Sequence, residues 1–131
     1  LNMNFKQHAL IIFGIACAIL LVYQIANAKH LHTEKFYQDQ WCSERGGQTE
    51  VVLPDKARCD CLTADYAVEF DFASKWAEAV GQALYYSVVL HKPAGIVLIM
   101  EDPVKDQKYL ERLMAIVNYL PVPITVWVMV P

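Results

Sequence analysis

The chain lacks the features that mark repeat arrays, disordered tails and multi-domain proteins. Its 131 residues contain no internal repeat, no low-complexity tract and no linker rich in proline or glycine. A length of this order corresponds to one domain in most proteins. The sequence therefore predicts a single folded domain that follows an N-terminal segment.

Basic residues are also few. The chain has 11 lysine and arginine residues against 14 aspartate and glutamate residues, a formal charge of −3 at pH 7. Without Lys6, the part from residue 29 onward carries ten against fourteen, which is −4. Affinity for a phosphate backbone comes largely from lysine and arginine. Because no basic tail or arm is present, the composition offers little electrostatic attraction for nucleic acid.

The hydrophobic excess of the chain, 56% of all residues, has a local source. Residues 9–25 are apolar except at three positions, follow Lys6 and precede Ala26-Asn27-Ala28. A basic start, an apolar middle and an A-x-A end are typical of a signal peptide, here residues 1–28 with cleavage after Ala28. This predicts export, to the periplasm or beyond. The alternative is an uncleaved anchor in the inner membrane through residues 9–25, a run near the lower limit of a membrane span.

The cysteines agree with export. Cys17 lies in the leader, which leaves Cys42, Cys59 and Cys61 in the domain of residues 29–131. In an oxidising compartment we expect one disulfide and one remaining thiol. Cys42 lies near the end of the first expected helix and can pair with either partner; Cys61 is favoured and Cys59 is the alternative. A zinc site is disfavoured because Cys59-x-Cys61 lacks the usual two-residue spacer.

Hydrophobic periodicity and turn residues predict the element order αβββαβαβ, an α/β fold. The first helix begins at Thr33, a plausible N-cap, and ends at Gly46-Gly47. Its apolar stripe is expected at Phe36, Tyr37, Gln40 and Trp41. A second helix is expected from Ser74 to about Leu90, and a third from about Lys105 to Tyr119. The expected strands are residues 48–53, 58–63, 66–72, 95–101 and 124–130, the last two as buried strands.

Three carboxylates fall on the second and third expected strands. Glu69 and Asp71 share one face of the third strand, because side chains alternate along a strand. Residues 63–65 are short enough to form a hairpin that brings Asp60 of the second strand beside Glu69 or Asp71. Converging carboxylates suit a hard divalent cation such as Mg²⁺. The simpler interpretation is a solvated face of a sheet.

The helix that follows carries Lys75, Glu78, Gln82 and Tyr86 along one stripe. We expect the opposite side, with Trp76, Val80, Leu84 and Val88, to face the core. The polar stripe starts directly after the acidic strand, which favours a site; an ordinary solvent-facing helix is the alternative.

The order αβββαβαβ, with Asp60 on the second strand and Glu69 on the third, resembles the PD-(D/E)xK, or restriction-endonuclease-like, superfamily. Gln82 and Tyr86 resemble the Q-x-x-x-Y motif of its RecB-like branch. The resemblance implies a mixed central sheet flanked by helices and a Mg²⁺ or Mn²⁺ ion held by Asp60, Glu69 and the carbonyl of Phe70. It also implies that Gln82 and Tyr86 contact substrate. The chain is similar, too, to small exported bacterial proteins of unassigned function.

The departure from the family lies at Asp71, which stands where the E-x-K lysine is expected. Lys75 could replace that lysine from the next helix, or Asp71 could serve as a further metal ligand. Arg58, on the face of Asp60, is a candidate phosphate contact or counter-ion. The first hypothesis is an exported metal-dependent nuclease that acts on nucleic acid. The second is an inactive nuclease-like scaffold that binds proteins of the cell envelope.

Overall fold

The computed structural model describes residues 5–26 and 30–131, and among these the side chains of residues 7–19 and 30–131. The chain divides near residue 31 into two units, which are treated separately. The first contains helix α1 (Phe5–Ala26). The expected cleavage after Ala28 lies outside the described residues. Among the residues described, no helix meets the length and apolarity needed to cross a membrane.

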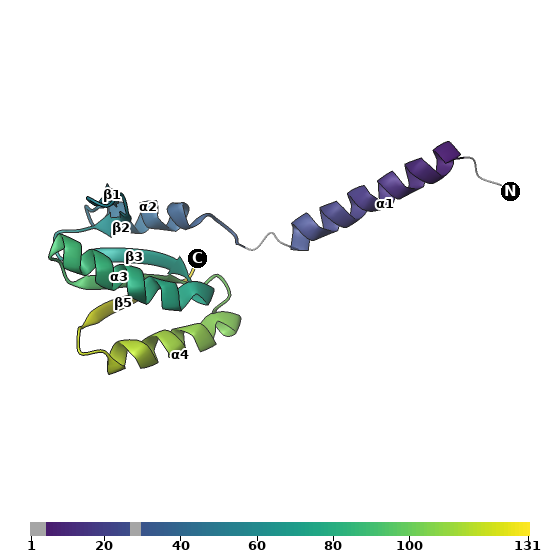
Figure 1. Ribbon diagram of the computed structural model, residues 1–131. Helices are drawn as coiled ribbons and strands as arrows, with labels where there is room; N and C mark the ends of the chain where they lie inside the picture. Colours follow the sequence, from purple (N-terminus) through teal and green to yellow (C-terminus); the bar gives the residue numbers. More distant parts are fainter. Residues whose placement is uncertain (1–4, 27–29) are drawn as a thin grey trace. The chain divides into compact units, whose positions relative to one another are not determined.

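The second unit is a mixed α/β domain with the predicted element order (Figure 1). Its elements are α2 (Glu34–Glu44), β1 (Gln48–Val52), β2 (Arg58–Leu62), β3 (Ala67–Phe72), the short 3₁₀ helix η1 (Ala73–Lys75), α3 (Trp76–Leu90), β4 (Ala94–Ile99), α4 (Pro103–Tyr119) and β5 (Ile124–Met129). The five strands form one sheet in the order β1-β2-β3-β4-β5. The pairs β1–β2 and β2–β3 are antiparallel, whereas β3–β4 and β4–β5 are parallel. The mixed sheet flanked by helices is confirmed.

Helix α2 covers one face of the sheet. Thr33 caps it as predicted, since its Oγ1 accepts from the backbone N–H of Phe36 at 3.3 Å. The predicted apolar stripe is wrong by one position: the buried residues are Tyr37, Gln38, Trp41 and Cys42, while Phe36 and Gln40 are exposed. The disulfide between Cys42 and Cys61 of β2 holds the side of the helix that carries Gln38 and Cys42 against the sheet. Gln40 therefore faces outward.

Helices α3 and α4 cover the other face (Figure 1). The buried side of α3 consists of Ala79, Ala83 and Tyr86, beside the partly buried Trp76, Val80 and Leu84. Val88, which we placed in the core, is 71% exposed. The face of α3 that packs on the sheet is formed by the small side chains of Ala79 and Ala83 and by Tyr86. Val88 lies outside this face. Ser74 does not cap the helix; η1 precedes α3 and no side chain caps it.

The two strands expected to be buried differ. All six residues of β4 are buried, as predicted for a strand covered on both faces. β5 stands at the edge of the sheet, pairs only with β4, and leaves Val128 45% exposed. The expectation of a buried last strand is therefore wrong, because an apolar run does not distinguish a central strand from an edge strand.

The sheet opens between β2 and β3. Their pairing is limited to Cys61 with Val68 and Leu62 with Ala67, whereas β2 stays paired with β1 as far as Arg58. Opposite the opening, Glu50 of β1 has φ +56°, a left-handed conformation that is strained for a residue with a side chain. The diverging strands form a fork, and the carboxylates lie there.

Candidate functional site

A pocket of about 410 Å³ lies at this fork. All seven side chains that the sequence proposed for the site line it: Arg58, Asp60, Glu69, Asp71, Lys75, Gln82 and Tyr86. Four further residues complete the wall: Glu34, Glu50, Lys56 and Ala57. The pocket thus joins side chains from α2, β1, β2, β3, η1 and α3, and five acids in it outnumber three bases. What these residues do stays a prediction.

The Asp60 side chain replaces a backbone hydrogen bond that is missing between β2 and β3. Its Oδ2 accepts from the backbone N–H of Phe70 at 2.8 Å, where the strands have parted. Burial raises the pKa of Asp60, and the hydrogen bond from Phe70, together with the nearby polar side chains of Glu69 and Gln38, opposes that rise.

Glu69 is the buried partner of Asp60 in the carboxyl pair. Its side chain is 4% exposed, and its Oε2 has no hydrogen-bond partner in the described structure. Burial, together with the charge and the hydrogen bond of Asp60, raises the pKa of Glu69 to about 10. At neutral pH one proton is shared between the two carboxyls, as expected for close acids that cannot both ionise cheaply.

Asp71 and Lys75 form the second pair. Lys75 Nζ lies 3.8 Å from Asp71 Oδ1, and the backbone N–H of Phe72 donates to the same oxygen at 2.9 Å. Burial raises the pKa of Asp71 to about 6, although Lys75 pulls it down. The ammonium is thus placed beside the residue that stands where a lysine was expected, one turn along the chain.

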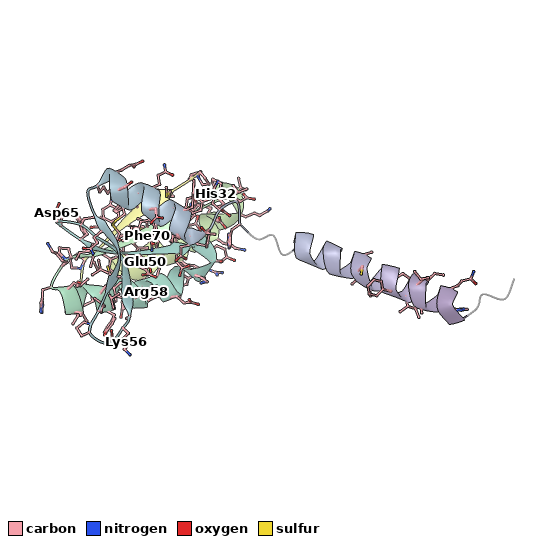
Figure 2. All side chains as sticks on the ribbon, turned by 90° about the horizontal axis from the view of Figure 1, so that it is seen from above. His32, Glu50, Lys56, Arg58, Asp65 and Phe70 are labelled. Carbon is pink, nitrogen blue, oxygen red and sulfur yellow. A yellow bond between two sulfur atoms is a disulfide. The ribbon has the colours of Figure 1, made fainter. Side chains whose placement is uncertain are left out.

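Arg58 is paired with an acid that sequence reasoning did not consider. Its guanidinium Nη1 lies 3.0 Å from Glu50 Oε2, and both residues are labelled in Figure 2. The exposed side chain of Arg58 remains at the mouth of the pocket. It acts here as a counter-ion of Glu50, and its proposed contact with phosphate stays a prediction.

Gln82 and Tyr86 meet on α3 as a pair. The Tyr86 hydroxyl donates to Gln82 Oε1 at 3.0 Å, one helical turn away. Tyr86 is 4% exposed, and burial followed by the charges of Glu69 and Asp60 raises its pKa. The hydrogen bond leaves the amide NH₂ group of Gln82 as the donor of this pair.

Two polar residues of α2 were missed. Glu34 opens the helix, and burial together with the charges of Asp60 and Asp71 raises its pKa to about 7. Gln38 lies one turn further on, 1% exposed, behind Asp60. The four-residue spacing of Glu34 and Gln38 is compatible with one face of a helix and could have pointed to them. Phe36 and Gln40 have the same spacing, so the sequence pattern fitted either face. Only packing decides which side of a helix this short faces the sheet.

The ligand atoms in the pocket are of the type that a hard divalent cation prefers, but they are few. Asp60 and Glu69 present oxygen acceptors to the pocket, and the buried Glu69 Oε2 lacks a hydrogen-bond partner in the described structure. Over the same residues, no group of three or more His, Cys, Asp or Glu side chains is arranged to hold a metal ion. Mg²⁺ commonly uses one or two carboxylates and keeps several waters. The pocket fits that mode and not a cage of protein ligands.

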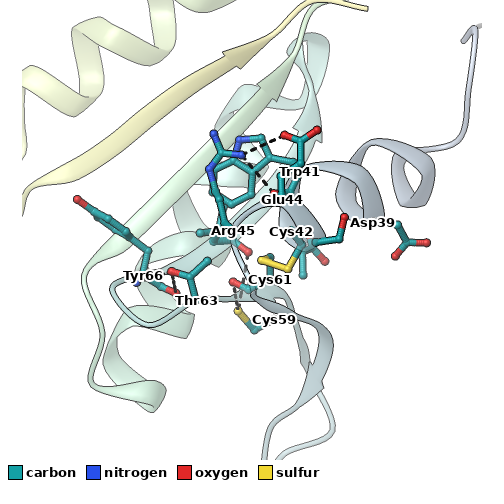
Figure 3. Close-up of a disulfide and its surroundings, with 12 residues drawn as sticks. Asp39, Trp41, Cys42, Glu44, Arg45, Cys59, Cys61, Thr63 and Tyr66 are labelled. Carbon is teal, nitrogen blue, oxygen red and sulfur yellow. Dashed lines mark hydrogen bonds and ion pairs between the residues drawn. A yellow bond between two sulfur atoms is a disulfide. The ribbon is translucent and has the colours of Figure 1, made fainter.

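The disulfide lies on the α2 face of the sheet, near the aromatic side chains (Figure 3). Cys42 and Cys61 are bonded, with their Cα atoms 5.9 Å apart, which confirms the favoured pairing. Cys59 keeps a buried thiol that donates to the backbone oxygens of Cys61 and Val68. Cys59 packs with Ala67 and Tyr86, whereas Cys61 packs with Trp41 and Cys42.

Comparisons with protein-family models, with curated proteins and with solved structures find no match to this chain.

Proposed function

We propose that the pocket is the site of a metal-dependent phosphodiesterase of the PD-(D/E)xK kind, in an exported nuclease-like protein. One observation carries the proposal: a shared-proton carboxyl pair, a carboxylate–lysine pair and a glutamine–tyrosine pair converge on one pocket at the fork of the sheet. A fold needs none of these three pairs side by side in a pocket for stability. The disulfide is also compatible with export.

Asp60 and Glu69, with the carbonyl of Phe70, would hold Mg²⁺ or Mn²⁺. Such an ion supplies Lewis acidity and lowers the pKa of a bound water. Glu69 would give up its proton when the cation arrives, because the cation replaces the proton as the neutralising charge between the two carboxyls. Asp71 would orient the attacking water or serve as a further ligand.

Lys75 would offset the charge that develops on the phosphate, as the displaced lysine of the E-x-K motif. The Gln82 amide would donate to substrate while Tyr86 fixes its orientation. Arg58 would contact a phosphate at the mouth of the pocket. The excess of acids means that the empty pocket repels a polyanion, so substrate binding would depend on the cation.

Hydrolysis of single-stranded and duplex DNA and RNA with Mn²⁺ or Mg²⁺ tests this proposal. Asp60→Asn, Glu69→Gln and Lys75→Ala should each lower the rate by about 10²-fold or more. Asp65→Asn is the matched control, since Asp65 is an exposed acid on the 63–66 turn and does not line this pocket. Ca²⁺ or Mn²⁺ should also raise the melting temperature of the wild type. If the protein shows neither hydrolysis nor a cation-dependent shift in melting temperature, the proposal has no support.

A second candidate function rests on a second pocket, of about 310 Å³. It is lined by Trp41, Tyr66 and Trp127 together with Arg45, Asp65 and two turn residues. The guanidinium of Arg45 lies 3.8 Å over Trp41, and Trp127 contacts both other rings edge-on. Tryptophan, tyrosine and arginine dominate the energetics of protein interfaces. An inactive scaffold that binds envelope proteins, tethered or not through residues 9–25, would use this surface.

The two functions are separable by variants. Trp127→Ala should abolish capture of an envelope protein and leave cation binding unchanged, whereas Asp60→Asn should do the reverse. Loss of both properties in one variant, with the fold retained, would contradict the assignment of two independent surfaces.

A further inference from the structure

The outer edge of β5 is a row of backbone groups that another strand could pair with. β5 is the last strand of the sheet and pairs with β4 alone among the described residues. The carbonyl of Met129 accepts from the N–H of Met100, which directly follows β4. Because the backbone groups of successive residues in a strand point in opposite directions, those of Val126 and Val128 point away from β4. Such a row is a template for a further strand.

The opposite edge of the sheet is protected, whereas the β5 edge is not. β1 carries Glu50 at its centre, where a left-handed backbone and an ion pair with Arg58 interrupt the edge. Charged side chains and local distortion of this kind are common means of preventing edge-to-edge pairing. β5 has neither, since it pairs with β4 in register over its six residues and none of its side chains is charged. A regular, uncharged edge of this kind favours pairing.

The distribution of charge favours a second copy of this chain as the partner. The domain of residues 29–131 carries ten basic and fourteen acidic residues, a formal charge of −4, so two copies repel each other in general. Residues 113–131, however, contain no Asp, Glu, Lys, Arg or His. This stretch includes β5 and the end of α4, with exposed apolar side chains at Tyr119, Val122, Val128 and Val130. Contact through it buries apolar surface and brings no like charges together.

We propose that two copies of this chain pair through β5, antiparallel about a two-fold axis at Val128, to form one continuous sheet. Under this symmetry each edge pairs with the other, so association closes at a dimer. Val128 then lies opposite the partner's Val128, and Val126 opposite the partner's Val130. Exposure supports this register, since Val128 is 45% and Val130 is 55% exposed, while Val126 packs against the core beneath α4. On the other face, Trp127 lies opposite the partner's Met129, and a thioether packs favourably against an aromatic ring.

The pairing is independent of the proposed phosphodiesterase site. The fork lies at β1, β2 and β3, and none of the β5 residues, all of which the structure describes, lines its pocket. The pocket formed by Trp41, Tyr66 and Trp127 is different, because the partner's Met129 would lie beside one of its walls. Dimerisation therefore leaves the residues of the fork pocket unchanged and adds a neighbour only to the aromatic pocket.

Sedimentation equilibrium of the full chain tests the dimer, in a density-matched detergent that covers the exposed apolar side chains of α1. The wild type should show twice the chain mass of 14.9 kDa. Val128→Lys puts two ammonium groups opposite each other at the axis and should raise the dissociation constant about 10-fold or more. Val52→Lys is the matched control and should remain a dimer, because Val52 is a 66% exposed valine on the other edge strand, β1.

Three results of this measurement would overturn the inference. The first is a monomeric wild type, and the second is a Val128→Lys variant that associates as tightly as the wild type. The third is a series of particles larger than a dimer, because pairing about a two-fold axis closes.

A crosslink tests the register and does not depend on how a charged variant folds. In a Cys17→Ser background, which removes the exposed thiol of α1, Val128→Cys places two thiols across the axis. The Cα atoms of a hydrogen-bonded antiparallel pair lie about 5.5 Å apart, within the range of a disulfide. Mild oxidation should give a disulfide-linked dimer that reduction reverses, and Val52→Cys should give none. Absence of the crosslink in Val128→Cys, or equal crosslinking of the two variants, would overturn the pairing about Val128.

Discussion

Two regions near β2, the disulfide region and the fork, contrast sharply. In the disulfide region, Cys42 and Cys61 are bonded and Trp41 packs against both Phe70 and Trp127. At the fork, four acids have raised pKa values, and the buried Glu69 Oε2 has no hydrogen-bond partner among the described residues. The first region stabilises the fold, and the second is maintained at a cost to it. A cost of this kind, beside a braced and covalently closed region, marks the part of the molecule in which function is to be sought.

Removal of the disulfide should have the largest effect on stability. Cys42→Ser with Cys61→Ser should lower the free energy of unfolding by about 2–4 kcal/mol, because the bond closes a loop of 19 residues. Denaturant unfolding measures the loss. Mass spectrometry of protein from the cell envelope should find the Cys42–Cys61 crosslink; fully free thiols there would contradict the expectation of export.

Gly47→Ala should damage the same region by another route. A Cβ at Gly47 would lie 2.6 Å from Cys42 Sγ and 2.7 Å from Cys61 Sγ, both immobilised in the bond. We expect a loss of about 1–3 kcal/mol, typical of overpacking. Gly81→Ala is the control, since no atom lies within 4 Å of its added Cβ; within α3 it should stabilise by about 0.5–1 kcal/mol. Equal effects of the two variants would contradict this account of the disulfide region.

The carboxylate region should set the pH dependence of stability. The pKa of Glu69 rises from 4.5 to about 10, so between these values the folded state keeps a proton that the unfolded state releases. Stability therefore falls as pH rises. Glu34 and Asp71 add to this slope only up to about pH 7 and about pH 6. Glu69→Gln should flatten the profile above pH 7 and stabilise the metal-free protein at pH 8 by on the order of 1 kcal/mol.

Thermal melting from pH 5 to pH 9 checks the profile, and Glu111→Gln, an exposed substitution on α4, provides the control. A wild-type melting temperature that rises with pH would show that the carboxyl pair is not what limits stability.

Lys75→Ala should have the smallest effect on folding. The lysine side chain is 53% exposed and its nitrogen is 3.8 Å from Asp71, so the free energy of unfolding should fall by less than about 0.5 kcal/mol. Its removal takes away the charge that lowers the pKa of Asp71, so that pKa should rise above about 6. NMR titration of the Asp71 carboxyl measures this rise. A large loss of stability would instead mean that Lys75 is mainly structural.

Much of the fold followed from local pattern. The element order, the Thr33 cap, the hairpin through residues 63–65 and the fully buried β4 came from periodicity and turn residues. The buried faces of the helices were harder to predict from the sequence. Val88 was placed in the core and is exposed, and Gln40 was placed inward where Gln38 is. Short helices carry several residue sets that fit a stripe, and only contact with the sheet selects one.

The sequence by itself determined which residues could meet, because alternation along β3 puts Glu69 and Asp71 on one face and the hairpin returns the chain beside Asp60. It also limited the pairing of Cys42 to two cysteines. Tertiary structure alone decided that β2 parts from β3, that the Phe70 N–H donates to Asp60, and that α2 contributes Glu34 to the pocket. The reason is physical: alternation and turns act over a few residues, whereas a fork in a sheet and the face of a packed helix arise from contacts between segments distant in the chain.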